Sequence, residues 1–194
     1  MSITTEQIKE LRDATGVSIM QCKKALEEAN GDKEKALVIL RKKSKEVAEK
    51  KENRALGAGV VASYIHAGGG VGTMIELSCE TDFVGRNKDF QKLAYDIALH
   101  IAAMNPEFLK AEDIPKETKI KAQEVFKEEV KDKPEEMQEK ILEGKLAAYF
   151  SERILLEQKF VKNPELTIQN LVEEAVQKFG EKMEIHRFIR FSVK

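Results

Sequence analysis

The side chains capable of covalent chemistry or metal binding are few and scattered in this sequence. Cys22 and Cys79 show neither C-x-x-C spacing nor a paired metal-ligand pattern. Cys22 falls on the apolar stripe of an expected helix, and Cys79 falls on the apolar face of an expected strand, so both are interpreted as small core residues. The histidines, His66, His100 and His186, are far apart in the sequence. No catalytic or metal site is therefore expected, and no cofactor.

Two glycine-rich stretches, 57–59 and 68–70, invite a phosphate-binding interpretation. A phosphate loop needs backbone N–H groups that converge at a helix N-terminus. The first stretch follows a charged tract with no helix after it. The second joins two strand-like segments, with no Lys-Ser or Lys-Thr following. Both patterns favour hairpin geometry over nucleotide binding.

The segment Thr81, Asp82, Phe83 and Val84 places an aromatic residue beside a carboxylate, in the connection between an expected strand and an expected helix beginning near Asp89. Loops in such positions commonly carry function. Large aromatic residues are usually buried, so residue type alone predicts that Phe83 folds back onto its own core. The segment is thus a candidate binding site that depends on where this ring points.

Composition limits the classes of protein that fit. The formal net charge is −1, which disfavours a dedicated nucleic-acid-binding protein because such a protein needs a broad basic face. No apolar run approaches the ~20 residues that span a bilayer. The first residues lack the pattern of a signal or transit peptide, so a cytoplasmic location is expected.

Periodicity predicts an α+β fold with an N-terminal helical domain. Residues 1–53 read as three short helices with a thin core, which suits a docking module. The charged tract 41–54 is interpreted as an exposed helix end that runs into a linker. Residues 54–194 are predicted to form an α+β core with a small antiparallel sheet packed by helices. Within that core, 107–145 is expected to form a projecting helical arm.

Three finer predictions concern the core. Residues 58–66 and 73–79 alternate with period two and predict an antiparallel hairpin, with 183–193 as a further strand beside it. A stripe of apolar residues from 89 to 104 predicts a helix that covers one face of this sheet. A continuous helix is expected through Phe150, Ile154 and Leu155, and another helix is expected between a Thr167 cap and a Gly180 stop.

Long motifs give this chain a family resemblance. Residues 76–84, ELSCETDFV, closely resemble the internal signature of translation elongation factor Ts, and residues 11–26, LRxxTGVSIMxCKKAL, resemble its N-terminal signature. The segments 150–161, FSERILLEQKFV, and 188–191, FIRF, look like its C-terminal motifs. The similarity spans nearly the whole chain. One departure is that longer members carry a duplicated core, whereas this chain resembles the short form with a single core.

The resemblance implies a UBA-like N-terminal domain, a linker and an α+β core. It also implies a guanine nucleotide exchange factor that binds elongation factor Tu·GDP and promotes GDP release by displacing helices and Mg²⁺ of the GTPase. By resemblance, Phe83 wedges between partner helices, Asp82 fixes its register, and Thr81 and Val84 shape the turn. A homodimer in a 2:2 complex would supply the second core.

The same resemblance makes Arg12, Met20 and Lys23 candidates for N-terminal docking contacts. Their alternative interpretation, equally open, is partial core for Met20 and simple surface charge for Arg12 and Lys23. Two other functions compete with nucleotide exchange. One is a UBA-like adaptor, in which the Asp82-Phe83 segment has no role. The other is an enzyme using His66, Cys79 or the glycines, which requires a pocket with convergent polar groups.

Overall fold

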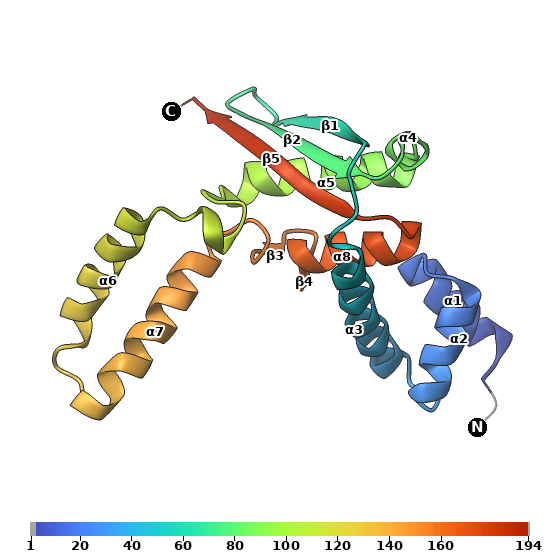
Figure 1. The fold of residues 1–194 in the computed structure, drawn as a ribbon, viewed down its shortest axis with the longest axis horizontal. Helices are drawn as coiled ribbons and strands as arrows, with labels where there is room; N and C mark the ends of the chain where they lie inside the picture. The colour runs from blue at the N-terminus through green and yellow to red at the C-terminus, as the bar shows by residue number, and fades with distance from the viewer. Residues whose placement is uncertain (1–2, 194) are drawn as a thin grey trace.

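The structure, a computed structural model, describes residues 3–193 and has the predicted α+β class (Figure 1). Residues 1–2 and 194, which the expected domain bounds include, lie outside the described residues. The elements run in the order α1 Thr5–Thr15, α2 Ile19–Glu28, α3 Lys33–Lys51, β1 Ala58–Ile65, β2 Val71–Cys79, α4 Asp82–Gly85, α5 Lys88–Met104, η1 Ala111–Asp113, α6 Lys116–Val130, α7 Glu135–Ser151, β3 Lys159–Phe160, β4 Asn163–Thr167, α8 Ile168–Phe179 and β5 Met183–Ser192.

Helices α1, α2 and the first half of α3 form an N-terminal module with its own small core. A capping box starts α1, because the Thr4 side chain accepts from the Gln7 N–H and the Gln7 side chain accepts from the Thr4 N–H. Gly16 ends α1 in the left-handed conformation, with φ of 68°. The fully buried core side chains of the module include Leu11, Cys22 and Leu26.

The tract expected to be an exposed helix end leading into a linker is only partly that. Helix α3 continues without a break to Lys51, and this second half packs against α8. Ser44 is buried, and Val47 and Ala48 contact the main core. Most residues of the tract are charged and lie on the other side of the helix. The composition of the tract therefore does not indicate its narrow apolar stripe. Residues 55–57, which have no regular secondary structure, then lead into β1.

The three-stranded sheet has the order β1-β2-β5 and is antiparallel throughout. The hairpin and the C-terminal strand were both predicted, and both are confirmed. The turn between β1 and β2 uses Gly68 and Gly69 with positive φ, which suits a hairpin connection. One face of the sheet is buried, and the buried side chains on it are Ile75, Leu77, Cys79, Met183 and Ile185.

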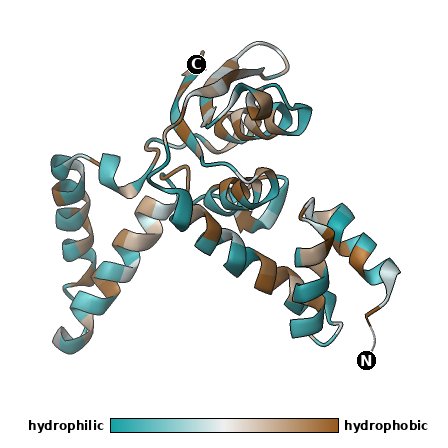
Figure 2. Ribbon diagram, turned by 45° about the vertical axis from the view of Figure 1, so that its right-hand side comes forward, coloured by the Kyte–Doolittle hydropathy of each residue, from teal (hydrophilic) through white to brown (hydrophobic). Residues whose placement is uncertain are grey.

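Helices α5 and α8 bury their apolar stripes in the same core as that inner face. The predicted stripe of α5 is confirmed, since Phe90, Ala94 and Ile97 are fully buried. Phe90 meets Phe179 at the end of α8 with their rings perpendicular and the centroids 6.3 Å apart. Thr167 caps α8 and Gly180 ends it, as expected. Figure 2 shows hydrophobic and hydrophilic residues as separate stripes around these helices.

Helices α6 and α7 lie antiparallel and project away from the sheet as an arm (Figure 1). The expected continuous helix through Ile154 and Leu155 is wrong, because α7 ends at Ser151. Beyond it the chain turns, and the Leu155 N–H donates to the Phe108 carbonyl at 2.8 Å. Ile154 and Leu155 are buried through this tertiary contact. A short two-stranded sheet, β3-β4, follows and was not predicted. Within residues 3–193, no helix has the length and apolarity needed to cross a membrane.

Two glycines bring α4 against the start of the sheet. A Cβ on Gly85 would lie 3.2 Å from the Gly59 carbonyl oxygen. A Cβ on Gly59 would lie only 2.5 Å from the Leu77 carbonyl oxygen and 2.9 Å from the Ser78 Cα. Both neighbours are backbone, which cannot swing aside as a flexible side chain can. The stretch considered above as a phosphate loop is instead a site of close backbone approach.

We expect Gly59→Ala to destabilise the fold by about 1–3 kcal/mol, the usual effect of forcing extra volume into a packed site. Urea denaturation followed by circular dichroism measures this difference. Gly70→Ala is the matched control, because nothing lies within 4 Å of a Cβ at that glycine and its φ is not positive. Equal midpoints for the two variants would contradict the close approach at Gly59.

Candidate functional site

The segment from Thr81 to Val84, called the tip from here on, is not the loop that its sequence predicts. Asp82 to Gly85 form the single turn of α4, and the Gly85 N–H donates to the Thr81 carbonyl at 3.1 Å. The chain then passes through Arg86 and Asn87, and the Asn87 side chain caps α5 by accepting from the Asp89 N–H at 2.8 Å. The tip is therefore a structured corner between a strand and a long helix.

Phe83 points into solvent from this corner. Its side chain is 79% exposed, whereas the next residue, Val84, is 3% exposed and belongs to the main core. The prediction from residue type alone, that Phe83 folds back onto the core, is wrong. Val84 makes that contact instead, and the one-turn helix turns the two side chains in different directions. The exposed carboxylate of the preceding residue, Asp82, pairs with Arg86 at 2.8 Å.

Thr81 is held by a residue that no local pattern indicates. The Glu181 carboxylate accepts from the Thr81 N–H at 3.0 Å and from its hydroxyl at 2.6 Å. The Cys79 thiol donates to the Thr81 carbonyl at 3.1 Å. All three polar groups of Thr81 are therefore used to fix the backbone immediately before Phe83.

Glu80 connects the same corner to two other parts of the chain. Its carboxylate accepts from the Lys182 N–H and from the Arg54 guanidinium, the latter at 3.2 Å. The Lys182 N–H, followed by the charge and hydrogen bond of Arg54, holds the pKa of Glu80 below its usual range. Glu80 is thus ionised at neutral pH and ties the end of β2 to the start of β5.

The N-terminal candidates are all exposed. Met20 is 68% exposed at the first turn of α2, so the partial-core interpretation of this residue is wrong. Ile19, which the sequence analysis did not single out, is exposed beside it. Arg12 lies in the last turn of α1, and Lys23 forms a 3.7 Å ion pair with Glu27. Figure 1 shows α1 and α2 on the same side of the molecule as α4, away from the arm.

The cysteines and histidines do not assemble into one site. Strand register places His66 beyond the turn end of β1, while Cys79 lies at the opposite end of the hairpin. His100 is buried and lies 3.0 Å from Gln158. Burial raises the pKa of both the Cys22 and the Cys79 thiol, and it lowers the pKa of His100. Among the described side chains, no group of three or more His, Cys, Asp or Glu is placed to hold a metal ion.

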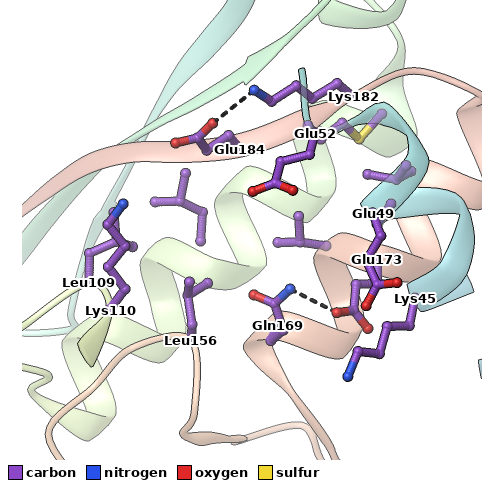
Figure 3. Close-up of a pocket in the computed structure, with 15 residues that line it drawn as sticks. Lys45, Glu49, Glu52, Leu109, Lys110, Leu156, Gln169, Glu173, Lys182 and Glu184 are labelled. Carbon is purple, nitrogen blue, oxygen red and sulfur yellow. Dashed lines mark hydrogen bonds and ion pairs between the residues drawn. The ribbon is translucent and has the colours of Figure 1, made fainter. Parts of the chain in front are cut away.

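A hollow of about 380 Å³ lies between α3, α8, β5 and the segment leading to η1 (Figure 3). Its floor is apolar, and charges of both signs surround it. Some of these polar side chains bind one another. Lys182 pairs with Glu184 at 3.5 Å, and the Gln169 amide donates to the Glu173 carboxylate at 2.8 Å. Figure 3 shows the long side chains around the rim and not converging on one point. The hollow lacks the convergent polar groups that the enzyme interpretation requires.

The architecture therefore defines an α+β protein with a helical N-terminal module and a structured, exposed tip. Residues 6–194 match the family model described as Elongation factor TS. Elongation factor Ts of Thermosipho melanesiensis is 48% identical over 193 residues, which cover 98% of each chain. Elongation factor Ts of Thermodesulfovibrio yellowstonii is 50% identical over 194 residues, which cover all of this chain and 97% of that one.

Elongation factor Ts of Thermotoga maritima is 44% identical, with all of this chain and 97% of that one covered. These matches extend over the whole length and include the tip, the N-terminal signature and the C-terminal motifs. The chain belongs to the elongation factor Ts family. It is therefore a translation elongation factor, and the resemblance inferred from its motifs is confirmed.

Proposed function

We propose that this chain is a guanine nucleotide exchange factor that binds elongation factor Tu·GDP and speeds GDP release. The observation that carries the proposal is the 79% exposed Phe83 on a backbone that Thr81 and Glu80 hold in place. An exposed aromatic on a rigid corner gains apolar burial only when another protein covers it. Membership of the elongation factor Ts family supports the choice of partner and a location in the cytoplasm.

The mechanism follows from linkage and needs no covalent chemistry. A factor that binds the nucleotide-free GTPase more tightly than the GDP-bound form must weaken GDP by the same factor. Burying about 150 Å² of the Phe83 side chain at about 25 cal/mol/Å² supplies at most about 4 kcal/mol, an upper limit of roughly a thousandfold weakening before the cost of moving the partner's helices is subtracted. This free energy is available only where partner helices have moved to admit the ring. Displacing those helices releases Mg²⁺, which otherwise neutralises the phosphates of GDP.

The other tip residues have supporting roles in this proposal. Asp82 makes polar contacts that set how the ring enters, and its pairing with Arg86 holds the carboxylate on the tip. Thr81 fixes the backbone through Glu181, and Val84 anchors the corner in the core. The wedge is therefore rigid before it meets its partner, so little conformational entropy is lost on binding.

Phe83→Ala is expected to fold normally and to lose most exchange activity, because the substitution removes a side chain that has no role in the core. The measurement is release of fluorescent GDP from elongation factor Tu, with and without this chain. Circular dichroism and a urea midpoint confirm folding. The matched control is Val125→Ala, which removes an exposed apolar side chain from the arm. An unchanged GDP release rate with Phe83→Ala would overturn the assignment.

We also propose that Arg12, Met20 and Lys23 dock the N-terminal module on the GTPase domain of the same partner. The exposed apolar pair Ile19 and Met20 supports this, since such a pair gains from being covered. Removing residues 1–53 would be a poor test, because it also strips Val47 and Ala48 from the main core. Point substitutions test docking without that damage.

Met20→Ala is expected to weaken binding to elongation factor Tu about tenfold, in line with loss of one buried apolar anchor. Isothermal calorimetry with nucleotide-free partner measures it. Val38→Ala is the control, because Val38 is exposed on α3 outside the matching motif. Equal affinities of Met20→Ala and the unsubstituted chain would remove Met20 from the docking surface.

A homodimer, giving a 2:2 complex, is proposed to supply the second core half that longer relatives carry within one chain. The outer face of the sheet supports this proposal. Strand register sets Met74 beside Ile189, and Gly72 between Ile65 and Phe191. The apolar side chains exposed on this face are Val61, Ile65, Met74, Ile189 and Phe191. An antiparallel sheet that faces water normally carries polar residues there, so this face fits a second sheet packed against it.

We expect the unsubstituted chain to be a dimer by light scattering at micromolar concentration and Phe191→Asp to be a monomer. The introduced carboxylate would be buried without a partner in the dimer. Val38→Asp serves as the control, because it places the same charge on an exposed apolar position of the N-terminal module. A monomeric unsubstituted chain with full exchange activity would refute the dimer.

A further inference from the structure

Two of the contacts between the N-terminal module and the core involve α8. The first is the packing of α3 on α8, where Arg41 lies between two carboxylates, 3.6 Å from Glu174 and 3.8 Å from Glu165. This contact holds the long helix of the module. Helices α1 and α2, which carry the candidate docking residues, are joined to α3 through a short turn at Asn30 and Gly31, through their own thin core, and through the ion pairs Lys33–Glu10 and Lys43–Glu28.

The second contact is centred on the side chain of Lys178, in the last turn of α8. Its aliphatic part lies against the backbone of Gly16, since a Cβ on Gly16 would be 2.9 Å from Lys178 Cε and 3.0 Å from Cδ. Its Nζ bonds an Asp89 carboxylate oxygen at 2.7 Å. One lysine thus touches the end of α1, belongs to α8 and pairs with the first turn of α5.

The charges at this junction fit the ends of the helices that carry them. Asp89 lies in the first turn of α5, and a negative charge is favourable at the N-terminus of a helix. Lys178 lies in the last turn of α8, beside the end of α1, and a positive charge is favourable at the C-terminus of a helix. The hydrogen bond and charge of Lys178 hold the pKa of Asp89 below its usual range. The ammonium group therefore faces an ionised partner at neutral pH.

The junction around this pair is not packed solid. Thr15, Asp89, Leu93 and Lys178 are among the residues that line a hollow of about 150 Å³ between the module and the core. A Cβ at Gly16 would require the flexible end of Lys178 to shift, and the positive φ of 68° favours glycine at this position. Helix α5 begins three residues after α4, so Asp89 is firmly connected to the tip. Lys178 therefore links the end of α1 to the start of α5, the helix that directly follows the tip.

We propose that Lys178 is a positioning residue that fixes the spacing between the docking surface at Met20 and the wedge at Phe83. The inference rests on the proposed exchange function, in which both surfaces engage one partner. Two linked contacts reinforce each other only when their geometry matches the partner. Loss of Lys178 therefore weakens engagement of the partner and leaves the wedge itself intact.

The first test uses the free chain and needs no partner. Spin labels at Lys24→Cys on α2 and Ala103→Cys on α5 report the distance between the module and the core, because both positions are exposed and the native cysteines are buried. Lys178→Met keeps the stem and removes the charge, and it is expected to broaden the distance distribution. Lys178→Arg, which can still reach Asp89, is expected to keep it narrow.

Lys162→Met is the matched control. Lys162 also pairs with a carboxylate of α5, Asp96, at 2.7 Å, and the pair lies outside the residues that line the junction. It is expected to leave the distribution unchanged. Equal widths of the distance distribution for Lys178→Met and for the unsubstituted chain would overturn the inference. Equal broadening by Lys178→Met and Lys162→Met would also overturn it.

The second test separates positioning from wedging in the GDP release assay. Lys178→Met is expected to raise the concentration giving half-maximal release about tenfold, with the maximal rate unchanged within about twofold. Phe83→Ala should lower the maximal rate. If the unsubstituted chain does not speed GDP release from elongation factor Tu, the proposed function fails. The distance between the spin labels, which is measured in the free chain, does not depend on that outcome. Normal release by Lys178→Met at every concentration would overturn the inference even if the distribution broadens.

Discussion

Burial of α8 is the interaction on which the rest of the molecule depends. Ile168, Val172 and Val176 bury one side of this helix in the core that also holds α5 and the inner face of the sheet. The second half of α3 also packs against α8. A helix shared in this way makes the N-terminal module a fixed attachment of the core, although the two have separate apolar clusters. The long α3 helix can therefore extend from the core without a flexible linker (Figure 1).

The tip depends on the same framework in a different manner. The backbone of Thr81 is fixed by Glu181, and the preceding Glu80 is held by Lys182 and Arg54; these groups come from the segment between α8 and β5 and from the segment after α3. The only apolar anchor of the tip is Val84, held against the sheet where Gly59 and Gly85 permit close approach. Fixing the backbone with polar contacts leaves the Phe83 ring without intramolecular cover. Rigidity and exposure thus come from separate residues, and one can be altered without the other.

Periodicity in the sequence was enough to predict β1, β2, β5, α5 and α8, because each of these elements buries a regular stripe in one core. It failed at Ile154 and Leu155, where helical spacing continues but hydrogen bonds to the segment at Phe108 turn the chain instead. The motif around Phe83 identified the candidate tip. Its supports could not be found, because Glu181 is 100 residues from Thr81 and only the fold brings them together. Lys178 was hidden for the same reason, since no local pattern links it to Gly16.

The placement of the two cysteines has a consequence for redox behaviour. Cys22 lies in the core of the N-terminal module and Cys79 in the main core, and burial keeps both thiols protonated at neutral pH. A thiolate, not a thiol, reacts with oxidants and alkylating reagents, so the native fold protects both sulfurs. Each thiol becomes reactive only when its own cluster opens. The chain therefore carries one built-in chemical reporter for each core, and the two labelling rates show whether the module and the core open together or separately.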